Sequence, residues 1–417
     1  MAQNTSDVNN SHSFKKTFTA APHRMMFFSG IIQTLVPLMV WMLELTGRHT
    51  DLFSTLDTII PSAWAHGFIM LYGVVIFFIF GFLMTTYPRW MNGSSINKEQ
   101  YISSFIWMNL GIIIFEIGLF SNFTILTSGL IMFIFGWLLG FFALYKVYRN
   151  APAEDKTYET ILNASLIAGV SGCLSFLIWI YTDNWLYIQY ALNAGLWLFL
   201  LPVVITVCHR MIPFFSSCVI NDYTVFQPKW SLYLMIASCI GHFLLETNQT
   251  PQFFFITDIP LACLALYHSY KWNLISSLND RLLTILHIAF LWLGIGATLY
   301  STQSLYLFFT GELILARAPL HSLTIGFISS MLIAMATRVS LGHSGRPLAA
   351  SNYVMGIFIG IGLAAVLRIL ADTSVINTIF NIHLNIFAAL AWVICMLLWI
   401  IKFAPIYLSR RADGKPG

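Results

Sequence analysis

The stretch 317–348 constrains the fold of this chain most, because a long apolar run within it ends in polar residues on both sides. Between His321 and Arg338 it contains no other charged residue and no other histidine. As an α-helix this run would be about 26 Å long, which is most of the hydrocarbon thickness of a bilayer. We therefore expect His321 near one membrane face, and Arg338, His343 and Arg346 near the other.

The rest of the chain has the same apolar character. Of its 417 residues, 58% are hydrophobic and 9% are charged, whereas a soluble protein carries about 25% charged residues. The sequence predicts an all-α, polytopic transmembrane bundle of about twelve helices, with one helical domain over 25–405 and tails at 1–24 and 406–417. The longest connection, 209–228, is expected to lie in the membrane interface. The predicted helices span roughly residues 25–46, 63–87, 102–121, 123–148, 161–182, 185–208, 229–246, 252–271, 282–303, 316–338, 350–370 and 379–405.

The distribution of Lys and Arg predicts how this bundle is oriented. If the N-terminus is cytoplasmic, all but three of the 21 basic residues fall on the cytoplasmic side. The three exceptions are Arg48, Arg317 and Arg368. Because cytoplasmic loops carry an excess of Lys and Arg, we expect both termini to be cytoplasmic.

Charge and cysteine content exclude several classes of protein. The net charge of +4 comes from basic residues in short loops between apolar segments. We therefore expect membrane lipid as a partner and do not expect nucleic acid. The six cysteines are scattered and form neither C-x-x-C nor C-x-x-C-H. We therefore expect no disulfide framework and no covalently attached c-type haem. The 13 tryptophans are expected to face lipid or to pack.

The eleven histidines are the most informative polar residues in so apolar a chain. A single histidine at a helix end is most often a hydrogen-bonded interfacial residue, but several at one depth on different helices suit a metal site. The predicted orientation puts one group near the outer helix ends and another near the inner ends. The outer group, which we take as candidate metal ligands, is His66, His242, His321 and His383; the inner group is His23, His209, His268, His287 and His343.

Other charged residues offer further candidates for chemistry. Glu116 lies inside the helix predicted at 102–121, and together with His242 it is a weak candidate for carrying protons in catalysis. Glu246 and Glu312 are expected to be solvated helix ends. Arg338 and Arg346 are first of all topology residues, with a second use as partners of haem propionates or of another anion.

Several segments carry a resemblance to a known family of bacterial membrane proteins. They are Ala21-Pro-His23-Arg24, Trp64-Ala-His66, Met70-Leu-Tyr-Gly73, Pro88-Arg-Trp90, Arg210-Met-Ile-Pro213-Phe-Phe215, Leu286-His287, His321-Ser-Leu-Thr324, Leu341-Gly-His343-Ser-Gly345-Arg346 and the tail Ala404-Pro-Ile-Tyr with Arg411-Ala-Asp413. With these segments the chain resembles the NnrS family, whose members are linked to nitric-oxide stress and reported to carry haem and copper. The resemblance touches most of the length.

The resemblance implies a multi-pass protein of the bacterial inner membrane that binds haem b, with copper as a second candidate, and that meets nitric oxide (NO) as a small gaseous ligand. It implies that His66 and His321 are motif imidazoles at the outer face. It also implies cofactor-binding roles at the inner side for His23, Arg24, His287, His343, Arg338 and Arg346. A common version of the second-helix motif is His-x-His-Glu, whereas this chain has His66 followed by Gly, Phe and Ile, so one imidazole of that motif is missing.

Three functions remain open at this point. The first is a haem protein of the nitric-oxide or nitrosative stress response that binds NO or reduces it as a reductase-like oxidoreductase; its electron donor is unknown. The second is a twelve-helix transporter, although its mid-membrane residues are almost wholly apolar and transporters place polar sites there. The third is a non-catalytic sensor or assembly factor that holds haem or copper for a partner.

Overall fold

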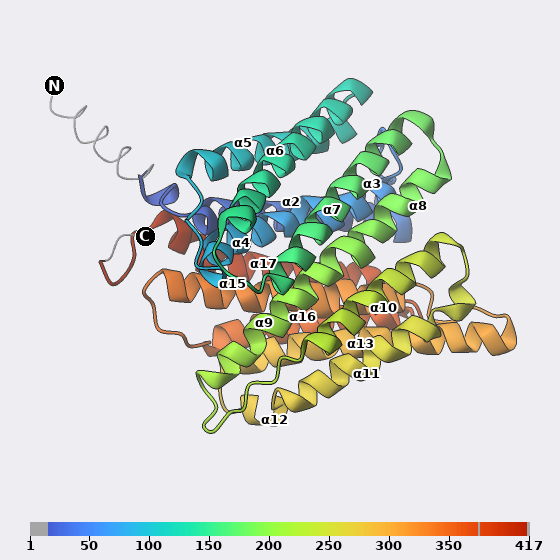
Figure 1. The fold of residues 1–417 in the computed structure, drawn as a ribbon. Helices are drawn as coiled ribbons and strands as arrows, with labels where there is room; N and C mark the ends of the chain where they lie inside the picture. The colour runs from blue at the N-terminus through green and yellow to red at the C-terminus, as the bar shows by residue number, and fades with distance from the viewer. Residues whose placement is uncertain (1–15, 374–375, 415–417) are drawn as a thin grey trace, which may run out of the picture.

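The computed structural model describes residues 16–373 and 376–414, and it is a bundle of long helices (Figure 1). Of the two predicted tails, residues 1–15 and 415–417 lie outside the described residues. The elements are α2 (Pro22–His49), α3 (Ser62–Phe68), η1 (Ile69–Val74), α4 (Val75–Trp90), α5 (Lys98–Leu119), α6 (Phe123–Asn150), α7 (Thr157–Thr182), α8 (Trp185–Asn193), η2 (Ala194–Leu200), α9 (Leu201–Ser217), α10 (Lys229–Thr247), η3 (Pro251–Phe253), α11 (Phe255–Lys271), α12 (Leu274–Ser277), α13 (Arg281–Thr310), α14 (Ala318–His321), η4 (Ser322–Ser329), α15 (Ser330–His343), α16 (Asn352–Leu370), β1 (Thr378–Ile379), β2 (Ile382–His383) and α17 (Leu384–Leu408).

Each of the twelve predicted helices coincides with a helix of the structure, so the all-α fold class is confirmed. Among the described residues, eleven helices are long and apolar enough to cross a membrane. The twelfth is α11, which has 17 residues and would be about 25 Å long. It packs between α10 and α13, so it completes the alternation of helix direction along the chain.

Three of the spanning helices contain a π-helical segment. In Ser62–Trp90, Trp185–Ser217 and Ala318–His343 the segments are η1, η2 and η4, respectively. A π-helical segment has i→i+5 hydrogen bonds, and such widened turns are frequent at functional sites. The first two of these helices are the most buried spans of the bundle, because 89% and 78% of the residues in their most apolar stretch are buried.

The structure corrects the sequence prediction in two places. The stretch 209–228 is not one long loop, because α9 continues to Ser217 with Pro213 inside it. The helix predicted at 379–405 begins later, at Leu384, after a two-stranded antiparallel hairpin in which Thr378 pairs with His383. Apolar periodicity finds the core of a helix better than its ends, where caps and local hydrogen bonds decide.

The helices α5 and α6 form the closest helix pair. Gly111 and Gly129 each lie against the backbone of the opposite helix, at Phe133 and Phe115. A Cβ atom at either glycine would collide with that backbone, so the close approach requires glycine. Small residues of this kind let helices pack where lipid gives no hydrophobic driving force.

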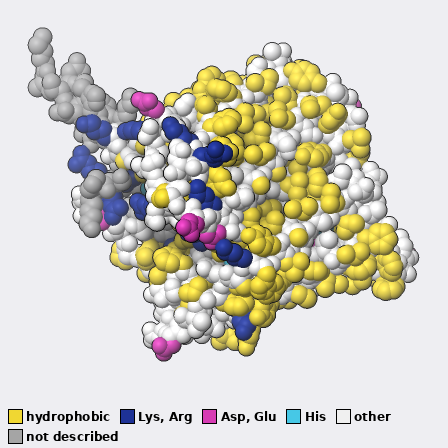
Figure 2. All heavy atoms as spheres, viewed as in Figure 1, with side chains coloured by type: hydrophobic (Ala, Val, Ile, Leu, Met, Phe, Trp, Pro, Cys, Tyr) yellow, Lys and Arg dark blue, Asp and Glu magenta, His cyan; other side chains and the backbone are white. Residues whose placement is uncertain are grey.

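The start of α2 and the end of α17 lie at the same end of the bundle (Figure 1). In the view of Figure 2, dark blue Lys and Arg side chains gather at that end, and the remaining face is mostly hydrophobic. Many large apolar side chains are exposed along the spans, for example Ile117, Phe142 and Ile401. A surface of this kind suits contact with lipid, so this is a multi-pass membrane protein.

Candidate functional site

The structure divides the candidate residues between the two ends of the bundle. We call the end that holds His66 and His321 the His66 end, and the opposite end, with His23 and His343, the His23 end. One helix, Ala318–His343, reaches from the first end to the second.

At the His66 end, the two motif imidazoles come from two different spans. The ring of His66 stacks on Trp41 of α2, with centroids 4.0 Å apart and planes 10° apart. Nδ1 of His321 lies 2.9 Å from the Arg317 carbonyl oxygen, to which it donates. The other ring nitrogen, Nε2, then carries a lone pair, as a metal-binding histidine requires. The two imidazoles are close enough for the charge on one to act on the other.

Three cations surround this pair: Arg48, Arg317 and Arg368 all act electrostatically on His66. They are the three basic residues that the orientation analysis left on the outer side. Arg368 forms an ion pair with Asp372, at 2.7 Å. Arg48 is likewise paired with Glu44, at 2.7 Å, so Arg317 is the one of these three without an ion pair among the described residues.

The other predicted outer histidines have different partners. His383 stacks on His49, with centroids 4.0 Å apart, and its Nδ1 accepts a hydrogen bond from the Asn385 backbone N–H, 3.2 Å away, at the start of α17. Burial, and then the charge of Arg368, lowers the pKa of His383. His383 therefore lies near Arg368 but acts as the N-cap of a helix.

His242 belongs to a separate buried cluster on α10. Its Nδ1 lies 2.8 Å from Oδ1 of Asp258, and both side chains are completely buried. The imidazole stacks on Trp197 of η2, with centroids 3.5 Å apart, and Oε2 of Glu246 lies 3.8 Å from Nε2. The sequence analysis missed Asp258, which a prediction from apolar runs treats as an ordinary first-turn acid.

At the His23 end, the second imidazole pair is tightly packed. The rings of His23 and His343 have centroids 4.7 Å apart, and Oγ1 of Thr85 lies 3.4 Å from Nδ1 of His23. Arg24 donates from Nη1 to the Ser409 carbonyl oxygen, at 2.7 Å, and so ties the start of α2 to the end of α17. Around the two histidines lie Arg24, Ser340, Ser344, Ile406 and Tyr407.

This end is rich in arginine. Arg89 and Arg411 act electrostatically on both His23 and His343, and Arg346 acts on Arg24. Nη1 of Arg346 is buried and has no hydrogen-bond partner among the described residues. Asp413 holds Arg411 through two hydrogen bonds and raises its pKa.

Two further candidates of the inner group lie apart from this pair. Nε2 of His287 lies 3.0 Å from Oγ of Ser216. The guanidinium of Arg338 lies 3.9 Å from the ring centroid of Phe215, a cation–π contact. Both therefore contact the end of α9 and do not join the His23 pair.

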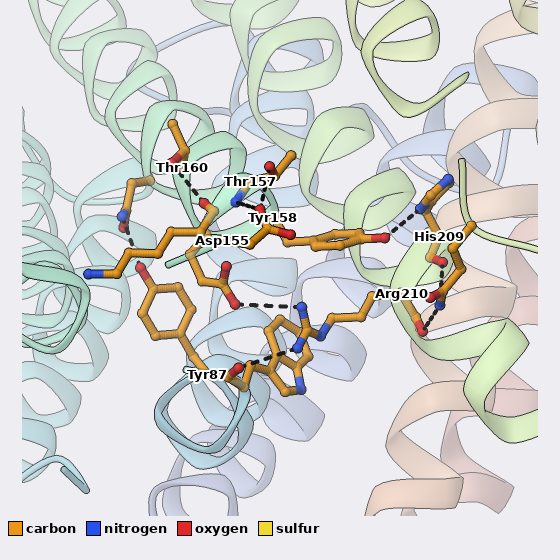
Figure 3. Close-up of polar contacts among 12 residues, drawn as sticks. Tyr87, Asp155, Thr157, Tyr158, Thr160, His209 and Arg210 are labelled. Carbon is orange, nitrogen blue, oxygen red and sulfur yellow. Dashed lines mark hydrogen bonds and ion pairs between the residues drawn. The ribbon is translucent and has the colours of Figure 1, made fainter. Parts of the chain in front are cut away.

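A polar network around Arg210 connects α4, α7 and α9 (Figure 3). The hydroxyl of Tyr158 lies 3.0 Å from Nδ1 of His209, and the guanidinium of Arg210 lies 3.7 Å from a carboxylate oxygen of the buried Glu159. Arg210 also packs over Trp90, with 4.6 Å between guanidinium and ring centroid. Two of the motif segments, Pro88-Arg-Trp90 and the one that begins at Arg210, thus contact each other.

Glu116 of α5 lies beside Gln33 of α2, within reach of its side chain. Its Oε1 is buried without a hydrogen-bond partner among the described residues. It is therefore an unsatisfied acid inside a membrane span, which leaves the predicted role in proton transfer open.

Taken together, the structure brings His49 to His383 and His23 to His343, and it keeps His242 in its own cluster. His66 and His321 lie at the same end of the bundle, within electrostatic range of each other. No group of three or more His, Cys, Asp or Glu side chains within 16–373 and 376–414 has a geometry that could hold a metal ion. Sequence reasoning also missed Trp41 and Trp197, because tryptophans at helix ends were assigned to lipid or packing.

The comparison with known proteins decides the family. Residues 17–411 match the family model described as NnrS protein. The chain belongs to the NnrS family. No curated protein matches it. The motif segments of this NnrS-family chain converge in space, since the segments with His23, His343 and Arg411 meet at one end of the bundle.

Proposed function

We propose that this NnrS-family protein binds haem b at the His66 end and serves in the nitric-oxide or nitrosative stress response of a bacterial inner membrane. His66 and His321 are the proposed ligands. The single observation that carries the proposal is that these imidazoles, from two spans, lie at one end of the bundle within electrostatic range, with Nδ1 of His321 bonded to the Arg317 carbonyl and Nε2 left as an acceptor.

The donor set fits a haem better than a metal held by protein alone. A haem iron takes four ligands from its porphyrin, so one or two imidazoles complete its coordination. Tetragonal Cu(II) sites and blue-copper sites take three or more protein ligands. Copper is therefore the second candidate in the proposal, and metal analysis of the purified protein tests it.

Charged neighbours also suit haem. The propionates of a haem are carboxylates, and arginine binds carboxylates in a bidentate way. Arg48, Arg317 and Arg368 supply positive charge beside His66. Arg24, Arg338 and Arg346 lie toward the other end, so in this proposal they hold a second anionic group or the helix ends.

A bound ferrous haem would supply an iron that binds NO. The chain's own part is to hold the ligands, keep water out and deliver protons. Reduction of two NO to nitrous oxide needs two protons and two electrons, and Glu116 and the Asp258–His242 pair are the proposed proton carriers. The two electrons would come from an external reductant.

The test is an absorption spectrum of the full-length protein purified after expression in a haem-replete host. A Soret band is expected, and His321→Ala should abolish or shift it. His49→Ala is the matched control, because His49 lies at the same end but outside the proposed pair. A protein without a Soret band, or an unchanged spectrum in His321→Ala, rejects this function or this ligand.

Turnover separates the remaining functions. Consumption of NO by the isolated haem protein with a chemical reductant would support a reductase-like role. Haem binding without consumption would favour the sensor or assembly factor, and uptake of a substrate into proteoliposomes without haem would favour a transporter.

A further inference from the structure

An apolar cavity lies at the centre of the bundle, away from both histidine pairs. Its volume is about 70 Å³, and its walls come from α2, α4, α9, η4 and α15. Most lining residues come from three spans, and Phe78, Val203 and Met331 are one example from each. Phe27 closes the cavity toward the His23 end, where its ring lies 6.2 Å from the ring of His23.

In three spans the lining of the cavity starts inside a π-helical segment or within three residues of its end. The segment η1 ends at Val74, one residue before the lining residue Val75. In the same way η2 ends at Leu200, just before Val203, and η4 includes the lining residue Ile328. The widened turns of the three cavity-forming spans thus all lie beside the cavity. Close packing of the helices alone does not require such turns.

The lining selects against water. A buried water needs two to four polar partners, whereas the only polar side-chain group in the lining is the thiol of Cys208. Apolar cavities of this kind stay dry and bind small apolar molecules or xenon. The thioethers of Met331 and Met335 add polarisable walls, which favour such ligands through dispersion.

The cavity opens toward the hydrocarbon region of the membrane. Most lining side chains are buried, but Val204 and Leu332 are partly exposed, and both lie in the middle of membrane spans. Small neutral gases dissolve in hydrocarbon, so they can reach this opening through the bilayer. A space of about 10–15 Å³ by this measure holds one water-sized molecule, so about 70 Å³ is ample for a small gas.

We propose that this cavity is a binding site for a small, neutral, apolar gas that enters from the lipid between α9 and α15. The identification of that gas as NO rests on the proposed function above. The site itself rests only on the cavity, its lining and its opening.

The test uses xenon as the probe, with crystals of the purified full-length protein held under xenon pressure. One anomalous peak is expected among Phe78, Val203 and Met331. Ordered water in the cavity, elongated density of an acyl chain, or a cavity without xenon would each overturn the proposal.

Two variants make the test sharper. Ala336→Phe places a ring in the cavity, and xenon binding should be lost. Val203→Ala enlarges the cavity, and xenon occupancy at the same pressure should rise, whereas Val366→Ala, the matched exposed control, should leave it unchanged. Equal occupancy in Val203→Ala and the parent protein counts against the site even where Ala336→Phe does not fold. None of these results depends on haem, so a missing Soret band with xenon bound would reject only the proposed function.

Discussion

Glu44 shows how one buried side chain sets the position of a candidate ligand. Its carboxylate accepts hydrogen bonds from Nε of Arg48, at 2.7 Å, and from the hydroxyl of Ser62 and the backbone N–H of Leu56, both at 2.8 Å. These bonds tie the end of α2 to the loop that follows and to the first residue of α3. Because His66 lies four residues after Ser62, this single carboxylate fixes where His66 meets Trp41.

We expect Glu44→Ala to destabilise the protein by about 1–3 kcal/mol, because it leaves three partly buried donors without their acceptor. The measurement is thermal unfolding in detergent, and the exposed Glu312→Ala is the control. Under the proposed function the Soret band should also weaken, since His66 loses its support. A variant that unfolds like the parent protein would show that the carboxylate is not needed to hold α3.

At the scale of whole elements, the connection between α6 and α7 is held to α10 by one ion pair. A carboxylate oxygen of Asp155 lies 2.7 Å from Nζ of Lys229, and the other oxygen accepts from the hydroxyl and the backbone N–H of Thr157. Lys229 is the first residue of α10, so the pair joins two helix starts at the same end of the bundle.

This ion pair predicts a pH dependence. The hydrogen bond from Lys229, followed by those from Thr157, lowers the pKa of Asp155 to about 2. A carboxylate whose pKa falls on folding stabilises the fold above its ordinary pKa of about 3.9, and this gain is lost as the pH falls toward 2. We expect Asp155→Asn to unfold at a slightly lower temperature than the parent at pH 7, because the pair is exposed and contributes little.

The difference between Asp155→Asn and the parent should shrink as the pH falls below about 4. Thermal unfolding of both proteins between pH 3 and pH 7, with Asp57→Asn as an exposed control, measures it. A difference that stays constant over this range would mean that Asp155 acts only through its size.

Long apolar runs made the membrane-spanning helices predictable. Their ends, their π-helical turns and the contacts between their side chains were not predictable. Twelve runs of sufficient length gave twelve helices. The π-helical segments could not be predicted, because nothing in the residues of η1 or η4 differs from an ordinary apolar helix. The extension of α9 to Ser217 was missed because the apolar run was ended at residue 208, before the polar pair His209 and Arg210. The pairing of His242 with Asp258 needed the packing of α10 on α11, which no single sequence shows.

For the whole molecule, segments far apart in the sequence meet at the His23 end. His23 from the start of α2 lies against His343 from the end of α15. The backbone N–H of Ala412 donates to the Ser344 carbonyl oxygen, at 2.9 Å, so the end of the chain closes the same cluster. The His23 end is therefore built from recognisable segments near residue 21, near residue 343 and near residue 411, which lie far apart in the sequence.

The number of helices predicts the side on which each end lies. Because α11 packs between α10 and α13 and reverses the chain once more, twelve crossings return the C-terminal end to the side where α2 begins. Because cytoplasmic loops carry an excess of Lys and Arg, we predict that this side is the cytoplasm. In a variant without native cysteines, Asp57→Cys should react with a membrane-impermeant maleimide in intact spheroplasts, and Ser94→Cys only after lysis. Labelling of Ser94→Cys in intact spheroplasts would reverse the orientation, and would place the proposed haem ligands His66 and His321 on the cytoplasmic side.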